Sequence, residues 1–139
     1  MNKGYEFFEH TADVGMRAWG ATLAELFAHA AQGLAALVAE DSAVQPAESR
    51  PVALSASSVE ELLQAWLTEL LVWFDAERFL PSVYDLESVS PTALRGSVRG
   101  ERFDPARHTA GTEVKGITRH QFRVEQRGGR WEATLIFDV

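Results

Sequence analysis

The first residues that could carry chemistry lie near the N-terminus, where His10 and Asp13 are three positions apart. They flank Thr11-Ala12, a break between two segments with strand-like sequence. A histidine and a carboxylate in one turn could have a functional role. An aspartate in a turn more commonly accepts hydrogen bonds from backbone N–H groups. The spacing alone leaves both interpretations open.

The second candidate is the C-terminus, where Asp138 is followed only by Val139 and its α-carboxylate. Two negative groups therefore lie one residue apart. The ending is apolar and has no polar tail, which suggests a fixed place for the terminal carboxylate even though chain ends usually fray. An ordinary edge strand with an exposed terminus would have the same sequence, so this alternative stays open.

The third candidate is the segment that contains Lys115 and His120, which flank a short strand break. These side chains could assist phosphate binding or proton transfer. Lone lysines and histidines are more often surface residues without a special role. The sequence contains no P-loop, no GxGxxG, no HExxH and no nucleophile elbow. It therefore predicts no catalytic residues of its own and no self-sufficient enzyme.

Length and composition limit the class of protein. At 139 residues the chain has the size of one domain, here residues 1–139. It has no cysteine, which excludes disulfides, zinc ribbons, iron–sulfur clusters and thiol nucleophiles. Its N-terminus lacks an apolar run typical of a signal peptide or anchor, and no stretch approaches the ~20 apolar residues that cross a bilayer. We therefore expect a cytoplasmic protein with no membrane partner.

The charge is unevenly distributed along the chain. The net charge is −7, which disfavours non-specific binding to nucleic acid. The segment Arg95–Arg130 nevertheless has nine basic and four acidic residues, a balance of +5, which leaves −12 for the rest. This asymmetry can indicate a partner-binding surface. Arginines on solvated strand faces would give the same pattern.

Two amphipathic helices are predicted to position these residues. The first begins at Thr22, with Glu25 in a capping relation, and continues to about Ala39. The second begins at Ser58, with Glu61 in the same relation. Apolar residues recur at helical spacing in both, which predicts one core-facing side for each helix. These residues are Leu23, Leu26, Phe27, Ala30, Leu34, Leu37 and Val38 in the first helix, and Leu62, Leu63, Trp66, Leu67, Leu70, Leu71 and Phe74 in the second.

The remaining segments are predicted to be strands. A Gly-Gly pair between two of them, at 128–129, is typical of a tight hairpin. Mostly consecutive strands with two separated helices predict an α+β fold: a single two-layer domain in which two main helices pack on an antiparallel sheet. The predicted strands are 5–8, 13–19, 51–56, 82–90, 93–101, 113–117, 121–126 and 131–139.

Taken together and in order, these segments resemble the archease family over nearly the whole chain. Two positions depart from the family pattern: Arg119 stands where tyrosine is common, and Gly116 where alanine is common. The matching segments are His10-Thr11-Ala12-Asp13-Val14-Gly15, Thr22-Leu23-Ala24-Glu25-Leu26-Phe27 with Ala30-Ala31, Leu62-Leu63 with Trp66-Leu67 and Glu69-Leu70-Leu71, Val114-Lys115-Gly116-Ile117-Thr118 with His120, and Phe137-Asp138-Val139.

The resemblance implies a divalent-cation site formed by Asp13, Asp138 and Val139. Three carboxylates repel one another, so their cluster becomes favourable when a cation joins it. Oxygen ligands suit Ca²⁺, Mg²⁺ or Mn²⁺. A nitrogen donor from His10 would favour Mn²⁺, and Lys115 would neutralise excess charge or meet a phosphate. The residues auxiliary to this site are His10, Lys115 and His120.

The resemblance also implies a role as an accessory protein of the RtcB-type tRNA-splicing ligase, which joins RNA ends using GTP and Mn²⁺. Such a protein promotes guanylylation of the ligase and its multiple turnover. Arg119 and Arg123 form a candidate partner surface, and any contact with RNA or GTP would be indirect. The alternatives are a general chaperone or a modulator of a nucleic-acid-modifying enzyme, and a stand-alone metal-dependent phosphohydrolase.

Overall fold

A computed structural model describes residues 3–10, 12–40 and 43–139. Every strand pairing within these ranges is antiparallel. The α+β class, with two main helices, is therefore confirmed. The described elements are β1 (Tyr5–His10), β2 (Asp13–Gly20), α1 (Leu23–Val38), β3 (Glu48–Ser55), α2 (Val59–Glu77), β4 (Phe79–Val89), β5 (Ala93–Arg102), β6 (Gly116–Arg127) and β7 (Arg130–Asp138).

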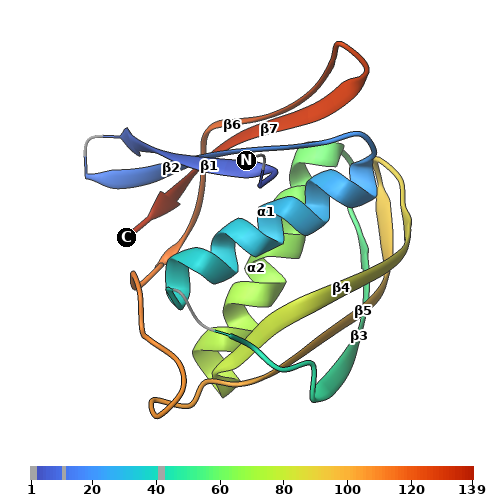
Figure 1. The fold of residues 1–139 in the computed structure, drawn as a ribbon. Coiled ribbons are helices and arrows are strands. Elements are labelled where there is room, and N and C mark those ends of the chain that lie inside the picture. The colour runs from blue at the N-terminus through green and yellow to red at the C-terminus, as the bar shows by residue number, and fades with distance from the viewer. Residues whose placement is uncertain (1–2, 11, 41–42) are drawn as a thin grey trace.

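The strands divide into two sheets. One has the order β1-β2-β7-β6 and the other the order β3-β5-β4. Figure 1 shows the four-stranded sheet on one side of the helices and the three-stranded sheet on another. Each helix contacts strands of both sheets. The buried residues of α1, which include Leu23, Leu26 and Ala31, form one wide stripe along the helix, and α1 lies against strands of both sheets.

Both helices begin as their sequences predict. The Thr22 hydroxyl accepts a hydrogen bond from the Glu25 N–H at 3.1 Å, and the Ser58 hydroxyl accepts one from the Glu61 N–H at 3.2 Å. These bonds satisfy N–H groups that have no partner inside the helix. All fourteen apolar residues predicted to face the core are buried. Local sequence therefore accounts for the position and orientation of both helices.

The strand prediction is wrong in one place that matters for function. The two short strands predicted at 113–117 and 121–126 are a single strand, β6, in which the pairing with β7 shifts between Thr118 and Arg123. Four residues, 119–122, therefore face one residue of β7; we call them the β6 bulge. The polar run inside the bulge resembles a strand break, but β7 continues alongside and holds both halves in one sheet.

One hydrophobic cluster joins both helices to both sheets. Met16, Phe27, Trp66, Phe79 and Phe137 are its largest members, each fully buried. The Trp66 indole N–H donates to the Phe27 carbonyl oxygen at 2.9 Å, which links α2 to α1. Within the described part of the chain, no helix is both long enough and apolar enough to cross a membrane.

Candidate metal centre

The four-stranded sheet has one face against the helices and one face away from them. Along β7, Leu135 and Phe137 are fully buried in the core. Because side chains alternate along a strand, Thr134, Ile136 and Asp138 point to the opposite side, which we call the outer face. The predicted ligand Asp138 therefore lies on the side of the sheet that the helices do not cover.

Strand pairing brings Asp13 and Asp138 together. Strands β2 and β7 pair with Val14 opposite Phe137, so Asp13 and Asp138 are the next residues along the same register. Opposite residues of an antiparallel pair have Cβ atoms about 4.5–5.5 Å apart. Val139 follows directly, and its side chain packs against the core. Figure 1 shows the C-terminus at the same end of the sheet as the end of β1 and the start of β2.

On its other side β7 pairs with β6, which begins at Gly116, directly after Lys115. Gly116 pairs with Asp138, and the Lys115 N–H donates to the Asp138 carbonyl oxygen at 2.7 Å. The Lys115 side chain is exposed. A methyl group added at Gly116 would meet nothing within 4 Å, so the absence of the family's usual alanine has no steric consequence. Among the described residues, Asp13, Asp138 and Lys115 form no ion pair.

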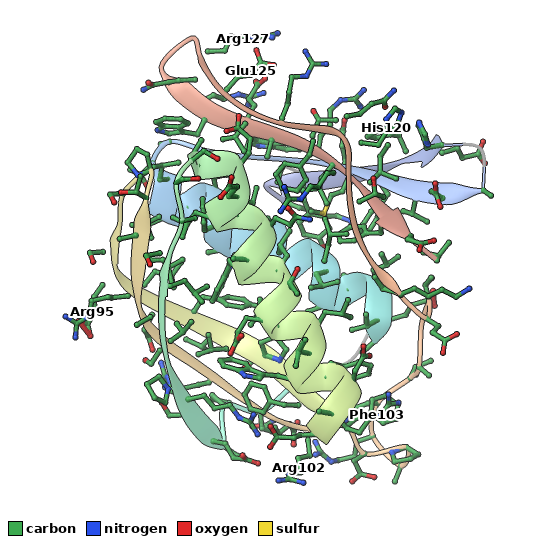
Figure 2. All side chains as sticks on the ribbon, turned by 180° about the vertical axis from the view of Figure 1, so that it is seen from behind. Arg95, Arg102, Phe103, His120, Glu125 and Arg127 are labelled. Atoms are coloured by element: carbon green, nitrogen blue, oxygen red, sulfur yellow. The ribbon has the colours of Figure 1, made fainter. Side chains whose placement is uncertain are left out.

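Two histidines lie at this same end. His10 pairs with Asp13 across the β1–β2 turn, and His120 belongs to the β6 bulge. Their ring centroids are 6.3 Å apart with the planes at 61°. Figure 2 shows His120 on the side of the sheet away from the helices. The His10 Nδ1 atom is buried and has no hydrogen-bond partner among the described residues, whereas the His120 side chain is exposed.

These donors fit a divalent cation. Carboxylate oxygens suit hard ions, and an unpartnered buried imidazole nitrogen suits an ion that also accepts nitrogen ligands. The strand register makes Asp13 and Asp138 neighbours on β2 and β7, and the His10 ring, opposite Asp13 on β1, lies near the His120 ring. In the part of the chain that the structure describes, no three histidine, aspartate or glutamate side chains are already arranged to hold a metal. Binding would therefore need the terminal carboxylate or an adjustment of the side chains.

The outer face next to this end is apolar. The Phe8 ring lies over Gly15, where an added Cβ would come within 2.3 Å of ring atoms. The Arg17 guanidinium in turn lies 4.6 Å from the centroid of the Phe8 ring. Ile136, which pairs with Gly15, is only 1% exposed although it points away from the core. Gly15 of the His10–Gly15 motif therefore makes room for the ring that covers the sheet.

The arginines of the predicted partner surface do not lie together in one cluster. Arg119 is exposed on the β6 bulge, and Arg123 lines a groove of about 510 Å³ on the outer face. Arg123 is 69% exposed and lies 3.8 Å from Glu125. Figure 2 shows Arg95, Arg102 and Arg127 at three separate places, so the basic segment does not form one continuous surface.

A buried polar cluster at the start of the β5–β6 connection was missed by the sequence-based reasoning. Glu101 and His108 are the buried charged or polar residues of the described chain, at 8% and 4% exposure. The Asp104 N–H donates to His108 Nδ1 at 2.8 Å, so the His108 Nε2–H donates to Glu101 at 3.0 Å. Arg107 and the Gln45 N–H also donate to Glu101, and together they lower its pKa to about 2. Gln45 lies 56 positions from Glu101, and the nearby Arg107 and His108 form no recognisable motif with it.

This cluster fastens the chain that leads to the candidate metal centre. Further along the same connection, the Gly111 and Thr112 N–H groups donate to the Val38 and Leu37 carbonyl oxygens at the end of α1, at 3.0 and 2.8 Å. These bonds satisfy carbonyl groups that the helix leaves without partners. The connection is therefore held against the end of α1 shortly before it reaches Lys115 and β6, which pairs with β7.

The chain is similar to known proteins over nearly its whole length. A family profile described as the Archease protein family (MTH1598/TM1083) matches residues 5–139. The chain is 38% identical over 137 residues to a protein archease of Sulfurisphaera tokodaii, with 97% of this chain and 98% of the relative covered.

Two solved structures share the fold. The solution structure of Methanobacterium thermoautotrophicum protein 1598 has a TM-score of 0.84 and 34% identity, and it covers 99% of this chain and 100% of its own. A Thermotoga maritima protein described as an archease and possible chaperone has a TM-score of 0.69 and 20% identity, with 95% and 94% covered. The second likeness supports the fold alone. From the profile match and the similarity of the full-length relatives, the chain belongs to the archease family.

Proposed function

We propose that the protein is a metal-binding accessory factor that activates a GTP-dependent RNA ligase of the RtcB type in the cytoplasm. It would promote guanylylation of the ligase and allow each ligase molecule to turn over repeatedly. It would perform no bond-making chemistry alone. The observation that supports this proposal is the strand register: Val14 lies opposite Phe137, so Asp13 and Asp138 are the next residues on two neighbouring strands, close to the C-terminus.

The residues that would hold the cation are Asp13, Asp138 and the carboxylate of Val139. A bound divalent cation would supply positive charge for phosphate groups, whose transfer depends mainly on positioning and charge neutralisation. Strand pairing holds the Asp138 backbone between β2 and β6, through Val14–Phe137 on one side and the Lys115 N–H on the other. The exposed Lys115 ammonium group lies on the adjacent strand edge, where it can meet a phosphate of the partner complex.

The proposal is tested by a guanylylation and ligation assay with the cognate ligase under limiting Mn²⁺ and GTP. Sub-stoichiometric protein should raise the number of ligations per ligase, and Asp13→Ala should abolish this effect. Glu87→Gln is a matched control, because Glu87 is an exposed carboxylate on β4, in the other sheet. Equal turnover with and without the protein, across metal and nucleotide concentrations, would contradict the proposal.

A general chaperone is the alternative raised by the description of the Thermotoga maritima relative. Chaperones that hold unfolded chains need exposed apolar surface. Among the described residues, the large exposed hydrophobic side chains are Phe7 and Val72, on β1 and α2. Two separate side chains do not make an apolar patch. If Asp13→Ala still suppressed the aggregation of unrelated proteins and no ligase responded, the chaperone role would replace the proposed one.

A further inference from the structure

We propose that the outer face of the four-stranded sheet binds a single strand of RNA, which lies along β6 and β7. The protein would then contact RNA directly, and not only through the ligase. The inference rests on the proposed function for the source of this RNA, the strand that the partner ligase joins. The binding itself can be measured without the ligase.

The groove of about 510 Å³ on the outer face is lined by side chains from all four strands of this sheet. Strand pairing places Arg17 of β2 and Arg123 of β6 on either side of Thr134, and Arg127 opposite Arg130. Opposite residues of neighbouring strands point to the same side of a sheet. The strand register therefore gathers these arginines around one groove, although they come from distant parts of the sequence.

The carboxylates of the groove leave an excess of positive charge. Glu125 is shared by two arginines, with Arg127 at 3.0 Å and Arg123 at 3.8 Å. The arginine side chains are between 48% and 69% exposed, and exposed ion pairs contribute little to stability, so phosphate groups can compete for them. The remaining pairs of the groove are Arg17 with Glu6 at 3.3 Å and Arg130 with Glu132 at 2.7 Å.

The positive charge continues along the edge strand β6 toward the candidate metal centre. Lys115 and Arg119, at that end, are both exposed, and Figure 2 shows His120 and Arg127 along the same strand. The neighbouring strand β7 has nine residues, so Arg130 and Asp138 lie about 26 Å apart at a rise of about 3.3 Å per residue. This length accommodates several nucleotides of an extended strand. The basic residues recur at every fourth position: Lys115, Arg119, Arg123 and Arg127.

Two aromatic rings in the groove favour a nucleic acid over an acidic protein segment. The Arg17 guanidinium lies 4.6 Å from the centroid of the Phe8 ring, and the Arg130 guanidinium lies 5.5 Å from the centroid of the Trp19 ring. Both rings are half-buried and line the groove. Bases of single strands stack on aromatic rings and on guanidinium planes, while arginines bind the phosphates. A carboxylate segment would neutralise the arginines but would supply no base for the rings.

Fluorescence anisotropy of a labelled oligouridylate of about twelve nucleotides, in about 50 mM salt, measures the binding. The double variant Arg123→Gln with Arg127→Gln removes two phosphate contacts, and both side chains are exposed, so it should fold. Each contact contributes about 0.7 to the slope of log Kd against log salt, so the slope should fall by about 1.4 and the Kd should rise about tenfold or more. The control Arg95→Gln with Arg102→Gln makes the same change in net charge at exposed positions of β5, in the other sheet, and should change the Kd less than about twofold.

Tryptophan fluorescence tests the stacking. A base stacked on the Trp19 indole should quench its emission, so oligouridylate should quench part of the wild-type signal. Trp19→Phe keeps an aromatic ring in the groove, so this variant should bind with similar affinity but lose the quenching. The other tryptophans pack in or against the hydrophobic core and should not respond: Trp66, Trp73 and Trp131.

Equal affinities of the Arg123 and Arg127 double variant and its control would overturn the inference. Competition by oligoglutamate or by inorganic polyphosphate that equals oligouridylate at the same charge would also overturn it, because the bases would then have no role. Either result would leave the proposed function standing if Asp13→Ala still abolished stimulation of the ligase. If Asp13→Ala stimulated the ligase like the wild type, the proposed function would fail, whatever the RNA affinity of the groove.

Discussion

Replacing Asp138 by asparagine should change the thermal stability in opposite directions with and without metal. Asp138 is exposed at the end of β7, and its register neighbour on β2 is Asp13. Like charges directly opposite in an antiparallel pair are destabilising, by about 0.2–1 kcal/mol. Asparagine has nearly the same shape but no charge. Without metal, Asp138→Asn should therefore be as stable as the wild type or slightly more stable.

The expected shifts follow from the size of the protein. With an unfolding entropy of about 2.1 cal/mol/K per residue, 139 residues give about 0.29 kcal/mol/K. Relief of repulsion should then raise the Tm of the metal-free variant by about 1–3 °C. At a metal concentration 100 times its Kd, the wild type gains about 2.7 kcal/mol, or about 9 °C. The variant, which lacks one ligand, should gain much less, so the order of the two Tm values should reverse.

Differential scanning calorimetry in chelator and in graded Mn²⁺ or Ca²⁺ measures both shifts. Glu87→Gln is the control, because it removes one exposed negative charge from β4 in the other sheet. It should follow the wild type at every metal concentration. The reasoning is refuted if Asp138→Asn responds to metal as strongly as the wild type. It is also refuted if the metal-free variant melts several degrees lower, since Asp138 would then stabilise the fold directly.

Three further outcomes are expected. A short C-terminal extension converts the Val139 carboxylate into a neutral amide and should weaken metal binding in calorimetry, whereas an N-terminal tag should not; equal affinities would mean that Val139 is only the end of a strand. Replacing Arg119 and Arg123 with alanine should reduce ligase stimulation and its salt dependence, because charges that salt can screen steer the association. If the stimulation kept the same salt dependence, both arginines would be ordinary solvated residues with no partner contact. Glu101→Gln should lower the urea midpoint at neutral pH. Because the Arg107 guanidinium and the Gln45 N–H lower the Glu101 pKa from 4.5 to about 2, the contribution of Glu101 to stability is complete above pH 4.5 and disappears as the pH falls through about 2. The difference between the two midpoints should therefore shrink over that range, and a constant difference would contradict this assignment.

The helices were predictable because their signals are local. Capping hydroxyls at Thr22 and Ser58 act on N–H groups three residues away, and the apolar spacing follows the turn of the helix itself. The same holds for most strands and for the Gly128-Gly129 turn, where both glycines have positive φ. The sequence also determined which residue types were available to a metal site, and in which segments they lie.

Tertiary structure decided which of those residues meet. Asp13 and Asp138 lie at opposite ends of the chain, and only the pairing of β2 with β7 makes them neighbours. The bulge that turns His120 toward His10 exists because β7 continues past a polar run that by itself resembles a strand break. The division into two sheets, and the contact of Glu101 with Gln45, 56 positions away, likewise depend on partners distant in sequence. Periodicity and capping are properties of a few consecutive residues, whereas strand register is set by the packing of the whole core, and no short stretch of sequence contains it.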